Sequence, residues 1–159
     1  MDKKERDRMI ALYRDGYRAV VDALHNADDE ALSAKPAPNK WSAREIVHHL
    51  ADSEMTAAVR LRVLLATDNP RIVGFDQDEF ARKLHYDRPM DASLELFKAV
   101  RRATAELLDR MSDADWTRQG VHTEHGAYGI ERWLEIYAPH AHNHANQILA
   151  ARDVARKGA

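Results

Sequence analysis

The chain has 159 residues, the size of one ordinary domain with a substantial core. Its 24 basic and 26 acidic residues give a formal net charge of −2, which argues against a nucleic-acid or membrane-surface partner. There is no cysteine, so disulfides and thiolate metal ligands are excluded, and any metal site must use His, Asp or Glu. The N-terminus lacks the apolar core of a signal peptide, and no apolar run reaches membrane length. We expect one cytoplasmic domain over residues 1–159.

Helical periodicity dominates the chain. Only six Gly and five Pro interrupt it, and the stretches between them are rich in helix-forming residues. The first helix is predicted over residues 3–26, where apolar residues recur at the spacing of one helix face. The segment 33–40, which contains Pro36 and Pro38, ends this first helical region.

The second long helix has the clearest start signal. Ser42 and Glu45 have the spacing of a capping box, and Trp41 and Ile46 have that of a hydrophobic staple. This pattern predicts a helix from Ser42 to about residue 67.

The remaining elements follow from caps and breaks. Asp76 is a predicted cap for a short helix that ends at residue 84, and Asp91 is a predicted cap for a long helix over 92–111. A single turn over 112–116, a loop over 117–129 and a last helix over 130–156 complete the prediction. The fold class is therefore all-α: a four-helix bundle with long connections after its second and third long helices.

The histidines are the main candidates for chemistry. Because the chain has nine of them, an i, i+4 pair carries little weight by its spacing alone. On the last helix, however, His140 and His144 fall on the same stripe as Trp133 and Ile136, whereas His142 falls on the opposite side. We therefore expect His140 and His144 to face the bundle interior.

The same test separates two neighbouring histidines on the second long helix. His49 falls on the flank of the apolar stripe, whereas His48 falls with Arg44 and Asp52 on the polar side. Three inward imidazoles from two helices match a catalytic zinc-type ligand set, which leaves a position open for water or substrate. Imidazole also suits nickel, iron and copper, so the ligand type alone does not select the metal.

Two alternatives remain open at this point. His140 and His144 are equally compatible with core histidines that hydrogen-bond to the backbone or to carboxylates, and a flank position such as His49 is often simply half-exposed. Glu45 and His48 also form a Glu-x-x-His step of the di-iron type. That site needs a second such step, which the last helix lacks, and Glu45 is better interpreted as a cap.

Pro139 is unusual because it falls inside the predicted last helix, next to His140. It removes a backbone hydrogen bond and is expected to bend the helix at that point, and the alternative is a helix that breaks there. In both cases His140 and His144 share one face of the following piece.

Two longer motifs resemble a known family. WSAREIVHHLADSE, at 41–54, and YAPHAHNHANQI, at 137–148, resemble the two signatures of the DinB/YfiT-like superfamily. The connecting segments NPRIVGFDQDEF and VHTEHG resemble those of its YfiT-like branch. The chain departs from that pattern at Pro139, where an aromatic is frequent, and at Thr123, where proline is frequent.

The resemblance implies a four-helix bundle that holds one divalent metal ion, most often zinc or nickel, through three histidines. Transferred to this chain by motif position, these ligands are His49, His140 and His144. The further candidates around them are Asp52 or Ser53 as residues that orient His49, Tyr137 and Gln147 as pocket residues, and His122, Glu124 and His125 from the loop.

The resemblance also implies an enzyme acting on a small molecule. Members are described as hydrolases, or as transferases or isomerases that use a low-molecular-weight thiol such as bacillithiol or mycothiol. We favour thiol transfer slightly over hydrolysis, because the sequence offers no obvious carboxylate base of the metalloprotease type. A non-catalytic metal- or ligand-binding bundle is the remaining alternative, and the apolar stripes also allow a homodimer.

Overall fold

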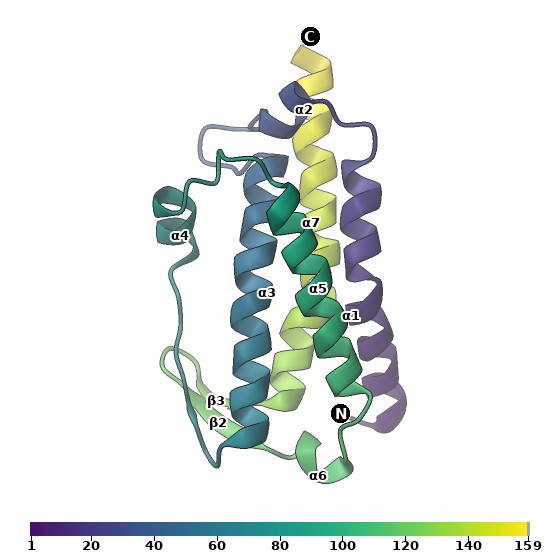
Figure 1. Cartoon of the computed structure of the whole chain (residues 1–159), viewed down its shortest axis with the longest axis vertical. Coiled ribbons are helices and arrows are strands. Elements are labelled where there is room, and N and C mark those ends of the chain that lie inside the picture. The colour runs from purple at the N-terminus through teal and green to yellow at the C-terminus, as the bar shows by residue number, and fades with distance from the viewer. Residues whose placement is uncertain (159) are drawn as a thin grey trace.

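The computed structural model describes residues 1–158, with side chains through residue 154. Four long helices form the bundle: α1 (Lys3–Leu24), α3 (Ala43–Ala66), α5 (Asp91–Leu108) and α7 (Ile130–Gly158) (Figure 1). Helix α1 packs against α7 and α5, and α3 packs against α5 and α7. Two apolar clusters fill the interior, one toward each end of the bundle. The predicted four-helix bundle is confirmed.

Short helices and caps join the long ones. Helix α4 (Gln77–Lys83) begins at the predicted Asp76 cap, and α6 (Asp113–Trp116) is the predicted single turn. Helix α2 (Asp29–Ser33) is an additional turn before the proline segment. The prediction that Asp91 caps the next long helix was wrong, because α5 begins at Asp91 itself, one residue earlier than predicted. The Asp91 carboxylate lies instead in the first turn, where the helix dipole stabilises a negative charge.

The start of α3 matches its prediction. The Ser42 hydroxyl accepts a hydrogen bond from the Glu45 amide, and the Glu45 carboxylate accepts one from the Ser42 amide, which completes the capping box. Trp41 packs against the apolar cluster that contains Ile46. The local sequence therefore fixes where α3 begins and, with it, the position of His49 along the helix.

The predicted loop over 117–129 was wrong. It contains a hairpin of β2 (Gln119–His122) and β3 (Gly126–Gly129), and β1 (Arg71–Ile72) pairs parallel to β2. A Cβ on Gly120 would lie 2.6 Å from the Pro70 carbonyl oxygen, so the close approach of these two segments requires glycine. Four-residue strands are short, and the pairing with β1 spans about fifty residues, so local periodicity does not reveal the sheet.

A buried ionic network ties the helices together at mid-height. The Arg101 guanidinium donates to the Glu54 carboxylate at 2.6 Å, to the Tyr13 carbonyl at 2.6 Å and to the Tyr137 carbonyl at 3.2 Å. The Tyr13 hydroxyl also hydrogen-bonds to Glu54. Because a buried charge is stable only when its donors and acceptors are matched, this network specifies how α7 sits against α1, α3 and α5 just before His140.

Helix α7 continues through Pro139 without a break, so His140 and His144 stand on one continuous helix.

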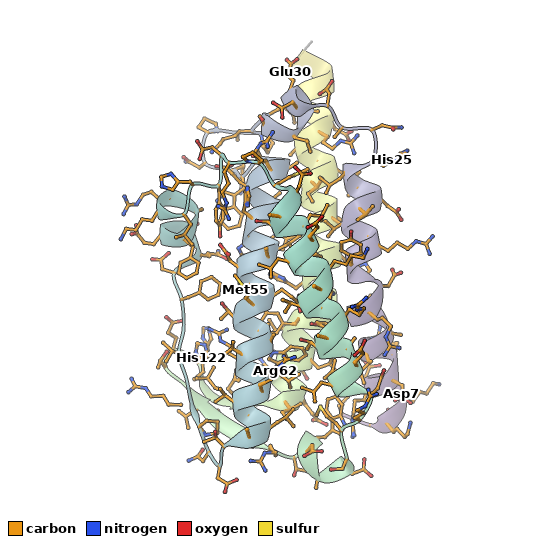
Figure 2. All side chains as sticks on the ribbon, viewed as in Figure 1. Asp7, His25, Glu30, Met55, Arg62 and His122 are labelled. Atoms are coloured by element: carbon orange, nitrogen blue, oxygen red, sulfur yellow. The ribbon has the colours of Figure 1, made fainter. Side chains whose placement is uncertain are left out.

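No helix among the described residues is both long and apolar enough to cross a membrane. Figure 2 places His122 on the hairpin beside the bundle, with Met55 and Arg62 on α3.

Candidate metal centre

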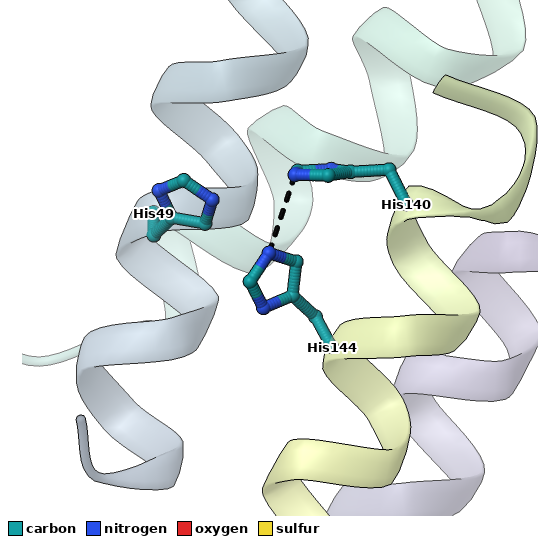
Figure 3. Close-up of side chains that lie close together, drawn as sticks. All are labelled: His49, His140 and His144. Carbon is teal, nitrogen blue, oxygen red and sulfur yellow. Dashed lines mark hydrogen bonds between the residues drawn. The ribbon is translucent and has the colours of Figure 1, made fainter. Parts of the chain in front are cut away.

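Three histidines converge between α3 and α7. His49 projects from α3 toward His140 and His144, which project from successive turns of α7 (Figure 3). One ring nitrogen from each lies within 4.8 Å of those of the other two. The centroid of the His49 ring lies 5.4 Å from that of the His140 ring and 4.7 Å from that of the His144 ring. Helical periodicity predicted all three to face inward, and the structure brings them together.

His49 has no hydrogen-bond partner among the described residues. Its side chain is buried, and neither Nδ1 nor Nε2 is within hydrogen-bond reach of another group. The Trp41 ring lies 4.7 Å away and screens it from solvent. Burial, reinforced by the nearby His144, lowers the pKa of His49 to about 3, so the imidazole is neutral at pH 7 and retains a free lone pair.

His140 and His144 face each other directly. Their Nε2 atoms are 3.2 Å apart, and the Nδ1–H of His144 donates to the Gln147 side-chain oxygen at 2.9 Å. The bond to Gln147 assigns the proton of His144 to Nδ1, so the Nε2 lone pair of His144 is directed into the cluster and accepts the hydrogen bond from His140 Nε2–H. Burial lowers the pKa of His140 to about 2 and also lowers that of His144.

These features fit a divalent metal ion. A ligating imidazole must be neutral and must direct a lone pair at the ion, while its other nitrogen is free to donate elsewhere. His144 meets this description through Gln147, and His49 has a buried nitrogen lone pair that no group among the described residues satisfies. In a core, an unsatisfied buried polar atom is uncommon and requires an explanation, which a metal ion would supply.

A pocket of about 480 Å³ opens beside the cluster. Its walls come from the connection before α3, the start of α4 and the outer turns of α7, and they include Trp41, His144 and Gln147. The volume is in the range that holds a small organic molecule. The cluster is therefore reachable from solvent along its His144 side.

Comparisons with known proteins identify the family of this chain. A sequence model of the DinB superfamily matches residues 12–148. The chain belongs to the DinB superfamily. It is 32% identical over 133 residues to a protein of Oceanobacillus iheyensis, covering 84% of this chain and 77% of that protein. It is also 32% identical over 162 residues to a protein of Geobacillus thermodenitrificans, covering 99% and 86%. Both relatives carry the name "Putative metal-dependent hydrolase".

A solved structure shares the fold. YfiT from Bacillus subtilis superposes with a TM-score of 0.87 at 23% identity, covering 99% of this chain and 90% of that chain. That protein is described as "a probable metal-dependent hydrolase with an unusual four-helix bundle topology". At this level of identity the similarity establishes the fold alone, a four-helix bundle.

The neighbouring histidines of this DinB superfamily member, His48 and His142, lie outside the cluster. His48 was wrongly predicted to be on a polar face: it is fully buried, its Nε2–H donates to the Arg88 carbonyl at 3.0 Å, and its Nδ1 lies 2.8 Å from the Ser93 hydroxyl. Helix α5 and the connection before it cover that side of α3, which the sequence of α3 cannot show. His142 points away from the cluster and bonds to the Leu12 carbonyl at 3.0 Å.

The predicted orientation of His49 by Asp52 or Ser53 is not observed. The Asp52 carboxylate accepts a hydrogen bond from the Tyr86 hydroxyl at 2.7 Å, and Ser53 is buried without a bond to His49. Residues three and four positions along a helix are neighbours on its surface, but here neither polar group forms a hydrogen bond to the imidazole. Position along the helix predicts proximity without predicting the hydrogen bond.

Tyr137 and Gln147 both lie beside the cluster, in different roles. The Tyr137 ring meets the His140 ring edge-on at 5.9 Å, and its hydroxyl accepts a hydrogen bond from Arg60 at 3.0 Å. Tyr137 thus packs against the His140 side of the cluster, whereas Gln147 lines the open pocket and accepts a hydrogen bond from His144. Arg60 was missed by the sequence analysis, because its long side chain reaches this region from more than two turns along α3.

A second group of potential ligands lies on the hairpin. His122, Glu124 and His125 each have one donor atom within 4.8 Å of the others. The backbone N–H of Glu124 donates to His122 Nδ1 at 3.1 Å, so the neutral His122 ring carries its proton on Nε2. Both nitrogens of His122 are therefore occupied, and an ion could bind this imidazole only after the turn had rearranged.

Proposed function

We propose that this chain is a metal-dependent hydrolase of small molecules, with one divalent ion held by His49, His140 and His144. The observation that carries the proposal is the buried, unpartnered imidazole of His49 directed at the His140–His144 pair. The names of the two relatives support the same reaction class. We expect zinc or nickel, since both accept an all-imidazole donor set.

When bound, a divalent ion supplies a Lewis acid that can polarise a substrate carbonyl and activate a nucleophile. The residues of the chain hold the ion and shape its surroundings. The three neutral imidazoles would leave the positive charge of the ion uncompensated, Gln147 fixes the ring of His144, and Trp41 packs against the ring of His49. The pocket beside His144 admits the substrate.

Thiol transfer is a second candidate, and one observation favours it. Among the described residues, no carboxylate hydrogen-bonds to any of the three histidines. Hydrolysis of amides usually employs such a group to move protons, whereas a thiol needs only to lose one proton to become a strong nucleophile. Under this alternative, a low-molecular-weight thiol is the cosubstrate.

One assay separates the two reactions. Protein purified without an affinity tag is loaded with zinc or nickel and tested on p-nitrophenyl esters, on amides, and on monobromobimane with cysteine as the thiol. We expect ester or amide cleavage that chelation abolishes and that His49→Ala lowers at least 100-fold. Cleavage that persists in metal-free protein would refute the proposal, and metal-dependent bimane consumption without any cleavage would assign thiol transfer instead.

A further inference from the structure

The pocket beside His144 carries one positive and one negative side chain. Lys40 stands in the connection before α3, and Asp78 stands in the first turn of α4, so the two approach the same pocket from separate segments. Trp41 supplies an aromatic wall, and both Gln147 and the metal-site residue His144 line the same pocket. The pocket thus combines two opposite charges with one edge of the histidine cluster.

Neither charge is used in the protein itself. Among the residues whose side chains the structure describes, Lys40 and Asp78 form no ion pair with each other or with any other group. Their neighbours differ: Lys35 pairs with Glu45 at 2.7 Å, and Glu79 pairs with Lys83 at 2.8 Å. The same two segments therefore satisfy their other charges internally and leave one of each sign at the pocket.

We propose that this pocket binds a small zwitterionic molecule of the amino-acid type. Its carboxylate pairs with Lys40, its ammonium group pairs with Asp78, and its remaining part reaches past Gln147 to the histidine cluster. A ligand with both charges matches the two side chains together, whereas a ligand with one charge leaves the other side chain unpaired. The proposal rests on the proposed function, because the metal at the cluster defines the reacting end of the ligand.

Four thiols test it, since each can bind the metal through its thiolate and they differ in which of the two charges they carry. Cysteine carries both charges, N-acetylcysteine carries the carboxylate, cysteamine carries the ammonium group, and 2-mercaptoethanol carries neither. Their dissociation constants are measured on cobalt-loaded protein from the thiolate-to-metal absorption band. The proteins are the wild type, Lys40→Gln and Asp78→Asn, with Lys4→Gln and Asp87→Asn as exposed, charge-matched controls.

We expect Lys40→Gln to weaken the binding of cysteine and N-acetylcysteine about three- to fivefold, which is the size expected for a partly exposed ion pair. The affinities for the other two thiols should not change. Asp78→Asn should weaken the binding of cysteine and cysteamine by a similar factor. The two control variants should bind all four thiols as tightly as the wild type. Equal effects on all four thiols, or no effect on any, would overturn the proposal.

A second arm separates this inference from the metal site. If no thiol produces an absorption band, the proposed metal function has failed, and S-methylcysteine is then titrated into metal-free protein while the thermal midpoint is measured. Stabilisation of the wild type that both pocket variants lose would support a zwitterion site without a metal. No stabilisation, or equal stabilisation of all variants, would refute it.

Discussion

Two groups of histidines in this protein bring metal-binding atoms within the same 4.8 Å, yet they differ in what those atoms are free to do. In the cluster of His49, His140 and His144, the last two share one hydrogen bond between their Nε2 atoms, and His49 has no partner among the described residues. On the hairpin, His122 Nδ1 already accepts a backbone hydrogen bond, and the His122 and His125 rings stack at an interplanar angle of 17°. Proximity alone therefore does not make a metal site.

The supporting structure explains the difference. The first cluster stands on two long helices that the Arg101–Glu54 network holds in place, and Trp41 covers it. The second stands on a tight turn, where the backbone must satisfy its own N–H groups and uses an imidazole to do so. Rigid elements can leave a buried lone pair free for a ligand, whereas a short turn consumes it.

The largest expected effect is on metal binding. His140→Ala should weaken binding of zinc more than about 100-fold, because even the loss of an outer hydrogen bond to a ligand costs about 10- to 100-fold. His125→Ala should leave binding unchanged. Isothermal titration of untagged, metal-free protein measures both affinities. Equal losses in the two variants would remove the distinction between the clusters.

An intermediate effect is expected on stability at low pH in metal-free protein. The pKa of His49 is lowered to about 3 and that of His140 to about 2, so the unfolded state takes up protons first as the pH falls below about 6.5. The stability that is present above pH 6.5 is then lost as the pH falls toward these folded-state values. At pH 5 each histidine should lower the free energy of unfolding by about 2 kcal/mol.

Urea unfolding at pH 7 and pH 5 measures this loss. His49→Leu should reduce the difference between the two pH values by about 2 kcal/mol, since one buried imidazole is gone. His125→Leu, on the exposed turn, is the matched control and should retain the full difference. A difference that is the same in all three proteins would show that the buried cluster does not control acid stability.

The smallest expected effect tests how His144 is held. Gln147→Leu removes the acceptor of the His144 Nδ1–H bond and should weaken metal binding about tenfold, without changing the ligand set. Asn146→Leu, at the neighbouring exposed position on α7, should change the affinity less than twofold. If both variants bind metal as tightly as the wild type, the bond to Gln147 has no part in orienting the ligand.

Much of the fold follows from local sequence. Ser42 and Glu45 form the predicted capping box, Asp76 and Ser112 cap their helices, and the apolar stripe of α7 turns His140 and His144 inward. These features depend on residues within one or two turns of each other, which is the range over which helix geometry is fixed. The sequence therefore determined the four long helices and the inward direction of His140 and His144.

Tertiary packing decided the rest. His48 is buried because α5 covers α3, the hairpin forms because β2 finds β1 across the chain, and the pocket at His144 exists because α4 folds back beside Trp41. None of these contacts lies within the reach of a helix turn, so no local pattern encodes them. The absence of a partner for His49 is also a property of the packed interior, because a lone pair is left free only by what surrounds it.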